Sequence, residues 1–276
     1  MLTAASGVPD AAAEAAARAA GGAPRRLAPG AVEVAMARPL PEDFALPGID
    51  LNAVPAEGRR KRMLIADMDS TIIGVECIDE LADFAGLKPQ VAAITEAAMK
   101  GELDFEAALI ARVALLKGLP VSVLDRCYAE RVRLNPGART LVRTMAAQGA
   151  ATALVSGGFS LFSERVAEAA GFARHRANRL EAKDGVLTGE VARPILGRAA
   201  KLTALREIAA EAGIEPEAVL AVGDGANDAD MVEAAGLGVA YHARPALDAV
   251  ADARLRHSDL TALLALQGIP ESEWRD

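Results

Sequence analysis

Three short apolar runs lie far apart along the chain, and polar residues or glycine follow each of them directly. The runs are Met63–Ala66, Ala151–Val155 and Val219–Val222. Each is too short for a confident helix and has almost no polar residue alternating with the apolar ones, as expected for a strand buried on both faces. Gly238–Tyr241 indicates a fourth strand. The pattern predicts an α/β fold, with helices on both faces of a parallel sheet.

Helical periodicity occupies the stretches between these runs. One apolar stripe predicts a helix that Asn135-Pro136 opens and Gly149 ends. A second amphipathic helix begins at about Lys201 and ends at Gly213. Residues 77–133 contain helical patterns without a convincing strand pattern. This tract therefore predicts a helical cap inserted after the first strand.

The first sixty residues carry weaker patterns than the rest of the chain. Ala11–Ala20 predicts an alanine-rich helix, and Ala31–Ala35 alternates like one short strand. We therefore treat residues 1–60 as an N-terminal extension of unknown role. The catalytic core is then expected to comprise residues 61–76 and 134–276.

A hairpin is predicted in the second half of the chain. Ala177–Ala182 and Val186–Val191 flank Lys183-Asp184-Gly185. An Asp-Gly pair between two alternating segments is typical of a tight β-turn.

Carboxylate and hydroxyl side chains follow the three buried runs. Asp67 and Asp69 come after the first run, Ser156 after the second and Asp224 after the third. Because ligands of a parallel sheet bind beyond the carboxyl ends of its strands, these side chains indicate a site there. Neighbouring carboxylates repel unless a cation lies between them, and oxygen ligands suit a divalent metal. Taken alone, Asp67–Thr71 is better explained as a solvated turn with a helix cap.

Two further features favour an anionic ligand. Ser156-Gly157-Gly158, at a strand-to-helix turn, leaves backbone N–H groups free beside a helix N-terminus. Lys201 lies in the early turns of its helix, where a cation is unfavourable for the helix dipole, so a partner anion would explain it. The alternative for Lys201 is an ordinary exposed lysine.

Composition narrows the class of protein. The 276 residues are 52% apolar, but much of this is alanine, and no charge-free apolar stretch is long enough to span a bilayer. A net charge of −8 disfavours a nucleic-acid partner. Cys77 and Cys127 are too few for a disulfide framework, and the start lacks the pattern of a secretory signal. We expect a soluble, cytoplasmic protein with no membrane partner, and its oligomeric state stays open.

The ordered set of motifs resembles a known superfamily. In order, the motifs are D-x-D-S-T at residues 67–71, S-G-G at 156–158, Lys201, and G-D-G-A-N-D at 223–228. This set resembles the haloacid dehalogenase superfamily of phosphotransferases. The segments E-C-I-D-E at 76–80 and R-V-A-L-L-K-G-L-P at 112–120 look like those of its phosphoserine phosphatases. The resemblance, which runs from about residue 62 to the C-terminus, implies a Rossmann-like core with an inserted helical cap.

The resemblance also implies roles for individual residues. Asp67 would attack phosphorus, and Asp69 would protonate the leaving oxygen. Mg²⁺ would be held by Asp67, Asp224 and the backbone carbonyl of Asp69. The other implied roles are phosphate binding by Ser156, Gly157, Lys201 and Asn227, orientation of this set by Asp228, and substrate binding by Glu76, Arg112, Met99 and Phe105.

These roles predict hydrolysis of O-phospho-L-serine to L-serine and phosphate through an aspartyl-phosphate, the final step of serine biosynthesis. Glu76 would meet the substrate's ammonium and Arg112 its carboxylate. The core motifs do not select the phosphoryl acceptor, so a relaxed phosphomonoesterase or a phosphotransferase is an alternative. A catalytically silent binding protein on the same fold is a second alternative, which the intact Asp67, Asp69 and Asp224 disfavour.

Overall fold

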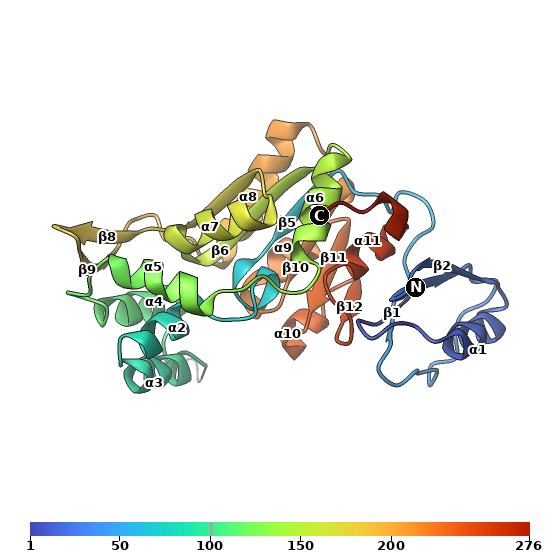
Figure 1. The fold of residues 1–276 in the computed structure, drawn as a ribbon, viewed down its shortest axis with the longest axis horizontal. Helices are drawn as coiled ribbons and strands as arrows, with labels where there is room; N and C mark the ends of the chain where they lie inside the picture. Colours follow the sequence, from blue (N-terminus) through green and yellow to red (C-terminus); the bar gives the residue numbers. More distant parts are fainter. Residues whose placement is uncertain (100–101) are drawn as a thin grey trace.

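A parallel six-stranded sheet forms the centre of the computed structural model, which describes residues 1–99 and 102–276 without the side chain of Met99. Its strands are β5 (Met63–Ala66), β6 (Ala151–Phe159), β7 (Arg174–Asn178), β10 (Val219–Gly223), β11 (Leu237–Tyr241) and β12 (Ala253–Leu255). They are arranged in the order β12-β11-β10-β5-β6-β7, and neighbours are parallel (Figure 1). The predicted strands are confirmed, and β5 lies between the two others that carry site residues.

Helices cover both faces of this sheet, as predicted. They are α6 (Ala138–Ala147), α7 (Ser160–Ala170), α8 (Arg198–Ala212), α9 (Ala229–Glu233), α10 (Pro245–Asp248) and α11 (Ala262–Leu266), with single turns at Pro216–Ala218, Ala226–Asp228 and Glu271–Glu273. Leu64 and Ala66 of β5 belong to the same core as residues of α6, α7 and α11. Met63 and Ile65 belong to a second core, with residues of α8, α9 and α10. Successive side chains of a strand point to opposite faces, so burial on both faces accounts for the uninterrupted apolar run.

Two strands at the edges of the sheet were not predicted. β7, with the sequence Arg-His-Arg-Ala-Asn, and the three-residue β12 are the outermost strands. An edge strand is partly solvated, so charged residues are tolerated there and the apolar signal of a strand is lost. Only the four inner strands therefore carry a hydrophobic pattern that sequence alone can detect.

The tract after β5 folds into four helices at one end of the sheet (Figure 1). They are α2 (Cys77–Phe84), α3 (Lys88–Met99), α4 (Phe105–Ala114) and α5 (Ser122–Arg131). The hairpin β8 (Leu180–Lys183) and β9 (Val186–Val191) contacts this group, because Leu187 N–H donates to the Leu119 carbonyl oxygen over 2.8 Å. The Asp-Gly turn is confirmed, with φ of 52° at Asp184 and 80° at Gly185. The first hairpin strand begins three residues later than predicted, because Ala177 belongs to β7 in the main sheet.

The start of α6 corrects the prediction of an Asn135-Pro136 helix opening. The helix begins at Ala138, after Gly137 with a φ of 80°. The Asn135 amide nitrogen instead donates to the Thr71 carbonyl oxygen over 2.8 Å. Asn135 therefore stabilises the loop after β5 rather than the end of a helix.

The N-terminal residues form a second, smaller sheet, where one helix and one strand were predicted. Its elements are β1 (Leu2–Thr3), α1 (Asp10–Ala20), β2 (Pro24–Ala28), β3 (Ala31–Val34) and β4 (Asp50–Leu51), with strands in the order β2-β3-β1-β4. Leu2, Val8 and Val32 belong to its own core. The two-residue strands β1 and β4 are too short to produce a periodic pattern.

Side chains of the N-terminal sheet bind the backbone beside β12. The Asn52 amide donates to the Arg254 carbonyl oxygen over 2.9 Å and accepts from Arg254 N–H over 2.8 Å. The Asp50 carboxylate accepts from the N–H groups of Arg256, over 2.9 Å, and His257, over 3.0 Å. These bonds satisfy backbone groups at the outer edge of the large sheet.

The alanine content is spent on helix packing. In α1, the alanines Ala13, Ala16, Ala17 and Ala20 are buried. Within the described part of the chain, none of the helices combines the length and the apolar character needed to cross a membrane.

Candidate active site

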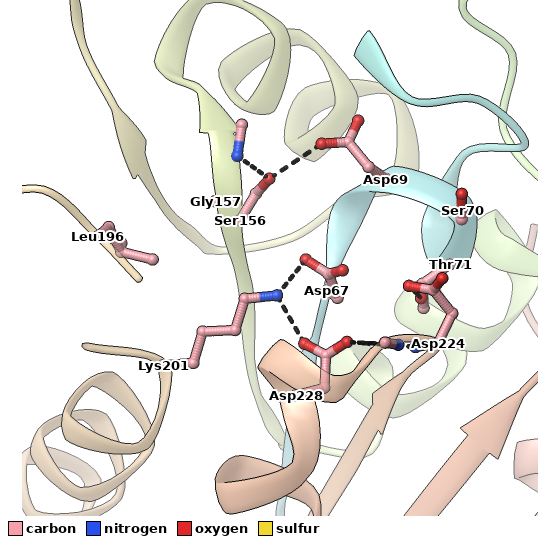
Figure 2. A network of polar contacts seen from close by, with 12 residues as sticks. Asp67, Asp69, Ser70, Thr71, Ser156, Gly157, Leu196, Lys201, Asp224 and Asp228 are labelled. Carbon is pink, nitrogen blue, oxygen red and sulfur yellow. Dashed lines mark hydrogen bonds and ion pairs between the residues drawn. The ribbon is translucent and has the colours of Figure 1, made fainter. Parts of the chain in front are cut away.

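Asp67 stands at the carboxyl end of β5, directly beyond the last strand residue. Its backbone N–H donates to the Val222 carbonyl oxygen over 3.0 Å, which continues the pairing of β5 with β10. Its side chain is buried, and residues Met68–Ile72 then turn tightly away from the sheet (Figure 2). Ser70, inside this turn, has a φ of 55°, a left-handed conformation that few non-glycine residues adopt. The turn directs Asp67 and Asp69 to the same end of the sheet.

Lys201 lies between two carboxylates at the centre of the site. Its Nζ is 2.6 Å from Oδ1 of Asp67 and 2.6 Å from Oδ1 of Asp228, and the lysine is 1% exposed (Figure 2). Burial disfavours the ammonium, but the two carboxylates more than offset this and raise the pKa of Lys201. The anionic partner expected for this early-helix lysine is therefore present twice.

Asp228 organises the loop that follows β10. Its Oδ2 accepts from the N–H of Asp224 over 3.2 Å and from that of Gly225 over 3.1 Å. A Cβ atom at Gly223 would lie 2.4 Å from Asp228 Cγ, so only glycine leaves room for this carboxylate. Asp224 is held from the opposite side by Thr71, whose hydroxyl lies 3.5 Å from its Oδ1.

The carboxylates of Asp67, Asp224 and Asp228 form a cluster suited to a divalent cation. One oxygen from each lies within 4.8 Å of the others. Burial first, and the charge of Asp228 second, raise the pKa of Asp67 well above its usual range and that of Asp224 to about 7. One buried lysine does not compensate three carboxylates, and a divalent ion would. Both oxygens of Asp228 already accept hydrogen bonds, so Asp67 and Asp224 are the better placed ligands.

Asp69 lies next to this cluster and contacts the end of β6. Its Oδ1 accepts from the Cys77 N–H over 3.1 Å, and its Oδ2 lies 3.4 Å from the Ser156 hydroxyl (Figure 2). Burial first, and the charge of Glu76 second, raise the pKa of Asp69 to about 6. A carboxyl with this pKa is protonated part of the time near neutral pH, as a general acid requires.

The Ser156-Gly157-Gly158 segment leaves the regular ladder of the sheet. The Ser156 hydroxyl oxygen accepts from the Gly158 N–H over 2.8 Å. A Cβ atom at Gly158 would lie 2.6 Å from Asp69 Oδ2 and 3.0 Å from Ser156 Oγ. The second glycine of the motif is therefore a steric requirement for bringing Asp69 beside Ser156.

We expect the variant Gly158→Ala to lower kcat/KM for a phosphomonoester by about 10²-fold, because a displacement of reacting groups by about 1 Å has an effect of this size. The control is Gly213→Ala, at a left-handed helix end with a φ of 61° and no atom within 4 Å of the added Cβ. This control should lose about 1–3 kcal/mol of unfolding free energy and keep its activity. Wild-type kinetics in Gly158→Ala would contradict the steric argument.

Glu76 and Arg112 come from the helical tract, and their charges interact. Glu76 is exposed, and its Oε1 accepts from the Ser70 hydroxyl over 2.7 Å. Arg112 donates from Nε to the Ala108 carbonyl oxygen over 3.2 Å. Burial lowers the pKa of Arg112, while the charges of Asp79 and Glu76 oppose the shift. The two predicted substrate residues therefore lie near each other, beside the turn that carries Asp69.

Phe105 bridges the helical tract and the sheet. Its ring lies 3.0 Å from the position of a Cβ at Gly157 and 3.2 Å from that of a Cβ at Gly197. Phe105 is 37% exposed, so its ring covers these glycines without entering a core. The predicted Met99 side chain lies outside the described residues.

Asn227 is half-buried in the single turn after β10. Its Oδ1 lies 2.4 Å from the position of a Cβ at Gly225, so the amide folds back against its own loop. Three residues with clear contacts in the site were not predicted: Ser70, Thr71 and Asn178. Ser70 and Thr71 belong to the D-x-D-S-T motif, whereas nothing in the sequence around Asn178 distinguished it from a hairpin residue.

Comparison with known proteins agrees with this geometry. The sequence model of the haloacid dehalogenase-like hydrolase family matches residues 64–233, which include every strand-end residue described above. The chain belongs to this family. Members generally use a divalent metal, in keeping with the aspartate cluster.

Relatives of this family member share much of its length. It is 49% identical over 215 residues to "Phosphoserine phosphatase SerB2" of Mycobacterium tuberculosis, covering 78% of this chain and 52% of the relative. It is 44% identical over 227 residues to "Phosphoserine phosphatase" of Polaromonas sp., covering 80% of this chain and 96% of the relative. The chain spans between half and two thirds of the length of the first three curated relatives that it matches.

Solved structures show the same architecture. "Substrate bound phosphoserine phosphatase complex structure" has a TM-score of 0.69 and 40% identity, covering 74% of this chain and 97% of that one. "Phospho-aspartyl intermediate analogue of phosphoserine phosphatase" also has a TM-score of 0.69 and 40% identity, covering 74% and 98%. The Rossmann-like fold predicted for the core is confirmed by these matches.

Proposed function

We propose that this chain is an Mg²⁺-dependent phosphoserine phosphatase that hydrolyses O-phospho-L-serine to L-serine and phosphate. The observation that carries the proposal is the buried Asp67 carboxylate, 2.6 Å from Lys201 and beside Asp69 and Asp224 at the strand ends. The names of relatives at 44–49% identity support the substrate. The reaction would be the final step of serine biosynthesis, in the cytoplasm.

Asp67 is the proposed nucleophile. Its carboxylate oxygen attacks phosphorus, the bond to the serine oxygen breaks, and an aspartyl-phosphate forms on Asp67. Lys201, already bonded to Asp67, orients the attacking carboxylate and places positive charge beside the phosphoryl oxygens. Ser156, the Gly157 N–H and Asn227 are the proposed partners of the other phosphoryl oxygens. These groups supply alignment and charge, which are what phosphoryl transfer requires.

Asp69 is the proposed general acid and base. Its carboxyl gives a proton to the departing serine oxygen and later takes one from the water that hydrolyses the aspartyl-phosphate. A pKa raised to about 6 by burial suits both steps near neutral pH. The Cys77 N–H and the Ser156 hydroxyl hold this carboxyl in place on its two sides.

Mg²⁺ fits the carboxylate cluster and is the proposed cofactor. Asp67, Asp224 and the backbone carbonyl of Asp69 would hold it, with Asp228 orienting the loop. When bound, Mg²⁺ supplies the positive charge that lets an anionic nucleophile approach a phosphate dianion.

The helical tract supplies the proposed substrate selectivity. In the proposed division, residues 77–133 form the cap over a core of 61–76 and 134–276. Glu76 would bind the substrate ammonium and Arg112 its carboxylate, and their electrostatic proximity supports recognition of one amino-acid head group. Phe105, with its ring over Gly157, would close the pocket.

The test is an assay of phosphate release from O-phospho-L-serine and from phosphoethanolamine, with and without Mg²⁺. Phosphoethanolamine lacks the carboxylate, so Arg112→Ala is expected to lower kcat/KM by about 10–100-fold for phosphoserine only, the range for a lost hydrogen bond between charged groups. The matched control is Arg126→Ala, which removes an exposed arginine from α5.

Each result has a distinct meaning. Equal efficiency of wild-type protein on both substrates would remove the role of Arg112. No phosphate release from any phosphomonoester, with Mg²⁺ present, would refute the proposed function.

A further inference from the structure

Asn178, the last residue of β7, has a fully bonded side-chain amide beneath the site. It is 3% exposed. Its Nδ2 donates to the carbonyl oxygens of Gly157, over 2.9 Å, and Leu196, over 3.1 Å, and its Oδ1 accepts from the Leu196 N–H over 2.7 Å. Both amide hydrogens and the carbonyl oxygen are thus used on two separate backbone segments.

The pairing of β6 with β7 explains why Gly157 needs a side-chain partner. Val155 pairs with Arg176 and Phe159 with Asn178, so three residues of β6 stand opposite one residue of β7. The ladder is interrupted at the Ser156-Gly157-Gly158 segment. A buried carbonyl without a partner is costly, and the Asn178 amide supplies the bond that the ladder omits.

The second segment leads into the helix that carries Lys201. Leu196 precedes Gly197, and the Lys201 N–H lies 3.3 Å from the Gly197 carbonyl oxygen, in the first turn of α8. Figure 2 draws Gly157, Leu196 and Lys201 around the same carboxylates. One amide therefore joins the segment proposed to bind phosphate to the segment that positions the lysine.

The same two segments support the cap. The Phe105 ring lies over both Gly157 and Gly197, the glycines beside the two backbone groups that Asn178 binds. A change in the spacing of these segments would therefore alter the surface under Phe105 as well as the phosphate contacts.

We propose that Asn178 is a positioning residue, which sets the distance between the Gly157 backbone and Lys201 and so shapes the phosphate site from below. This inference rests on the proposed phosphatase function. Asn178 does not touch the reacting atoms in this account, and its effect passes through the two backbone segments.

The test compares Asn178→Ala and Asn178→Asp with the matched control Asn52→Ala. Asn52 is also buried, and its amide also bonds one backbone residue in both directions, but beside β12. Asn178→Asp keeps the volume and places an oxygen against two carbonyl oxygens, so it has the same defect without a cavity. Circular dichroism establishes the temperature at which every variant is folded.

Both Asn178 variants are expected to raise the inhibition constant of inorganic phosphate by about 10-fold and to lower kcat/KM for p-nitrophenyl phosphate by about 10–100-fold, the usual range for a lost positioning contact. Asn52→Ala should lose stability and keep both constants within about 2-fold. Wild-type constants in a folded Asn178 variant, or equal losses in Asn52→Ala, would overturn the inference.

A binding measurement separates this inference from the proposed function. Inorganic phosphate with Mg²⁺ should raise the Tm of wild-type protein more than that of the Asn178 variants, whether or not the protein turns over a substrate. If wild-type protein releases no phosphate but this difference in Tm is present, the function fails and the inference stands. Equal Tm shifts in wild-type protein and the folded Asn178 variants would overturn the inference.

Discussion

Replacement of Asp67 by asparagine is expected to abolish turnover, with kcat reduced by about 10⁴-fold or more, as for other nucleophiles that act within a connected set. The variant should also form no acid-stable phosphoenzyme after rapid quenching with ³²P-labelled substrate. The neutral amide cannot attack phosphorus, although it preserves the shape of the side chain. Because burial and Asp228 already disfavour the ionised Asp67, the Tm measured without metal is not expected to fall.

Asp69→Asn is the paired control for this prediction. It lies two residues away and has the same change of charge, but the general-acid step is dispensable for a leaving group as good as p-nitrophenolate. This variant should still form phosphoenzyme from p-nitrophenyl phosphate, while its turnover of phosphoserine is lost. Phosphoenzyme trapped in Asp67→Asn would exclude Asp67 as the nucleophile.

The second large effect is expected from Lys201→Met. Methionine preserves the length of the side chain but removes the charge that lies 2.6 Å from Asp67 and 2.6 Å from Asp228. Loss of one buried partner leaves uncompensated charge, which typically costs about 3–5 kcal/mol of unfolding free energy. Loss of a positioned donor should also lower kcat/KM by about 10²–10³-fold.

Lys183→Met provides the control, because Lys183 is exposed beside the hairpin turn. Urea denaturation gives the change in unfolding free energy, and initial rates on the folded protein give kcat/KM. Lys201→Met with wild-type stability and wild-type rates would contradict the bonding of this lysine to both carboxylates. A stability loss without any loss of rate would confine Lys201 to a structural role.

Prediction from the sequence succeeded where burial leaves a local pattern. The run Met63–Ala66 is apolar at every position because both of its faces are covered, and it became the strand β5. The polar Arg174–Asn178 and the three-residue Ala253–Leu255 became edge strands that no pattern indicated. The Asn135-Pro136 helix opening was wrong because a contact with Thr71, 64 residues away, competes for the Asn135 amide.

The candidate site was predictable to a similar extent. Asp67, Ser156 and Asp224 could be named because each follows a buried strand directly. The burial of Lys201 could not be predicted, because it depends on how α8 packs against the loop of Asp228. The contribution of Asn178 was also unpredictable, since its partners Gly157 and Leu196 lie 21 and 18 residues away.

The sequence by itself determined which strands are buried and which polar residues stand at their ends, because both are properties of short, contiguous segments. Tertiary structure alone decided the pairing of Lys201 with two carboxylates, the bond from Asn178 to Gly157, and the contact of Phe105 with Gly157 and Gly197. These contacts join residues that are distant in the chain, and their strength comes from burial and geometry that exist only after the sheet, the helices and the cap have packed together.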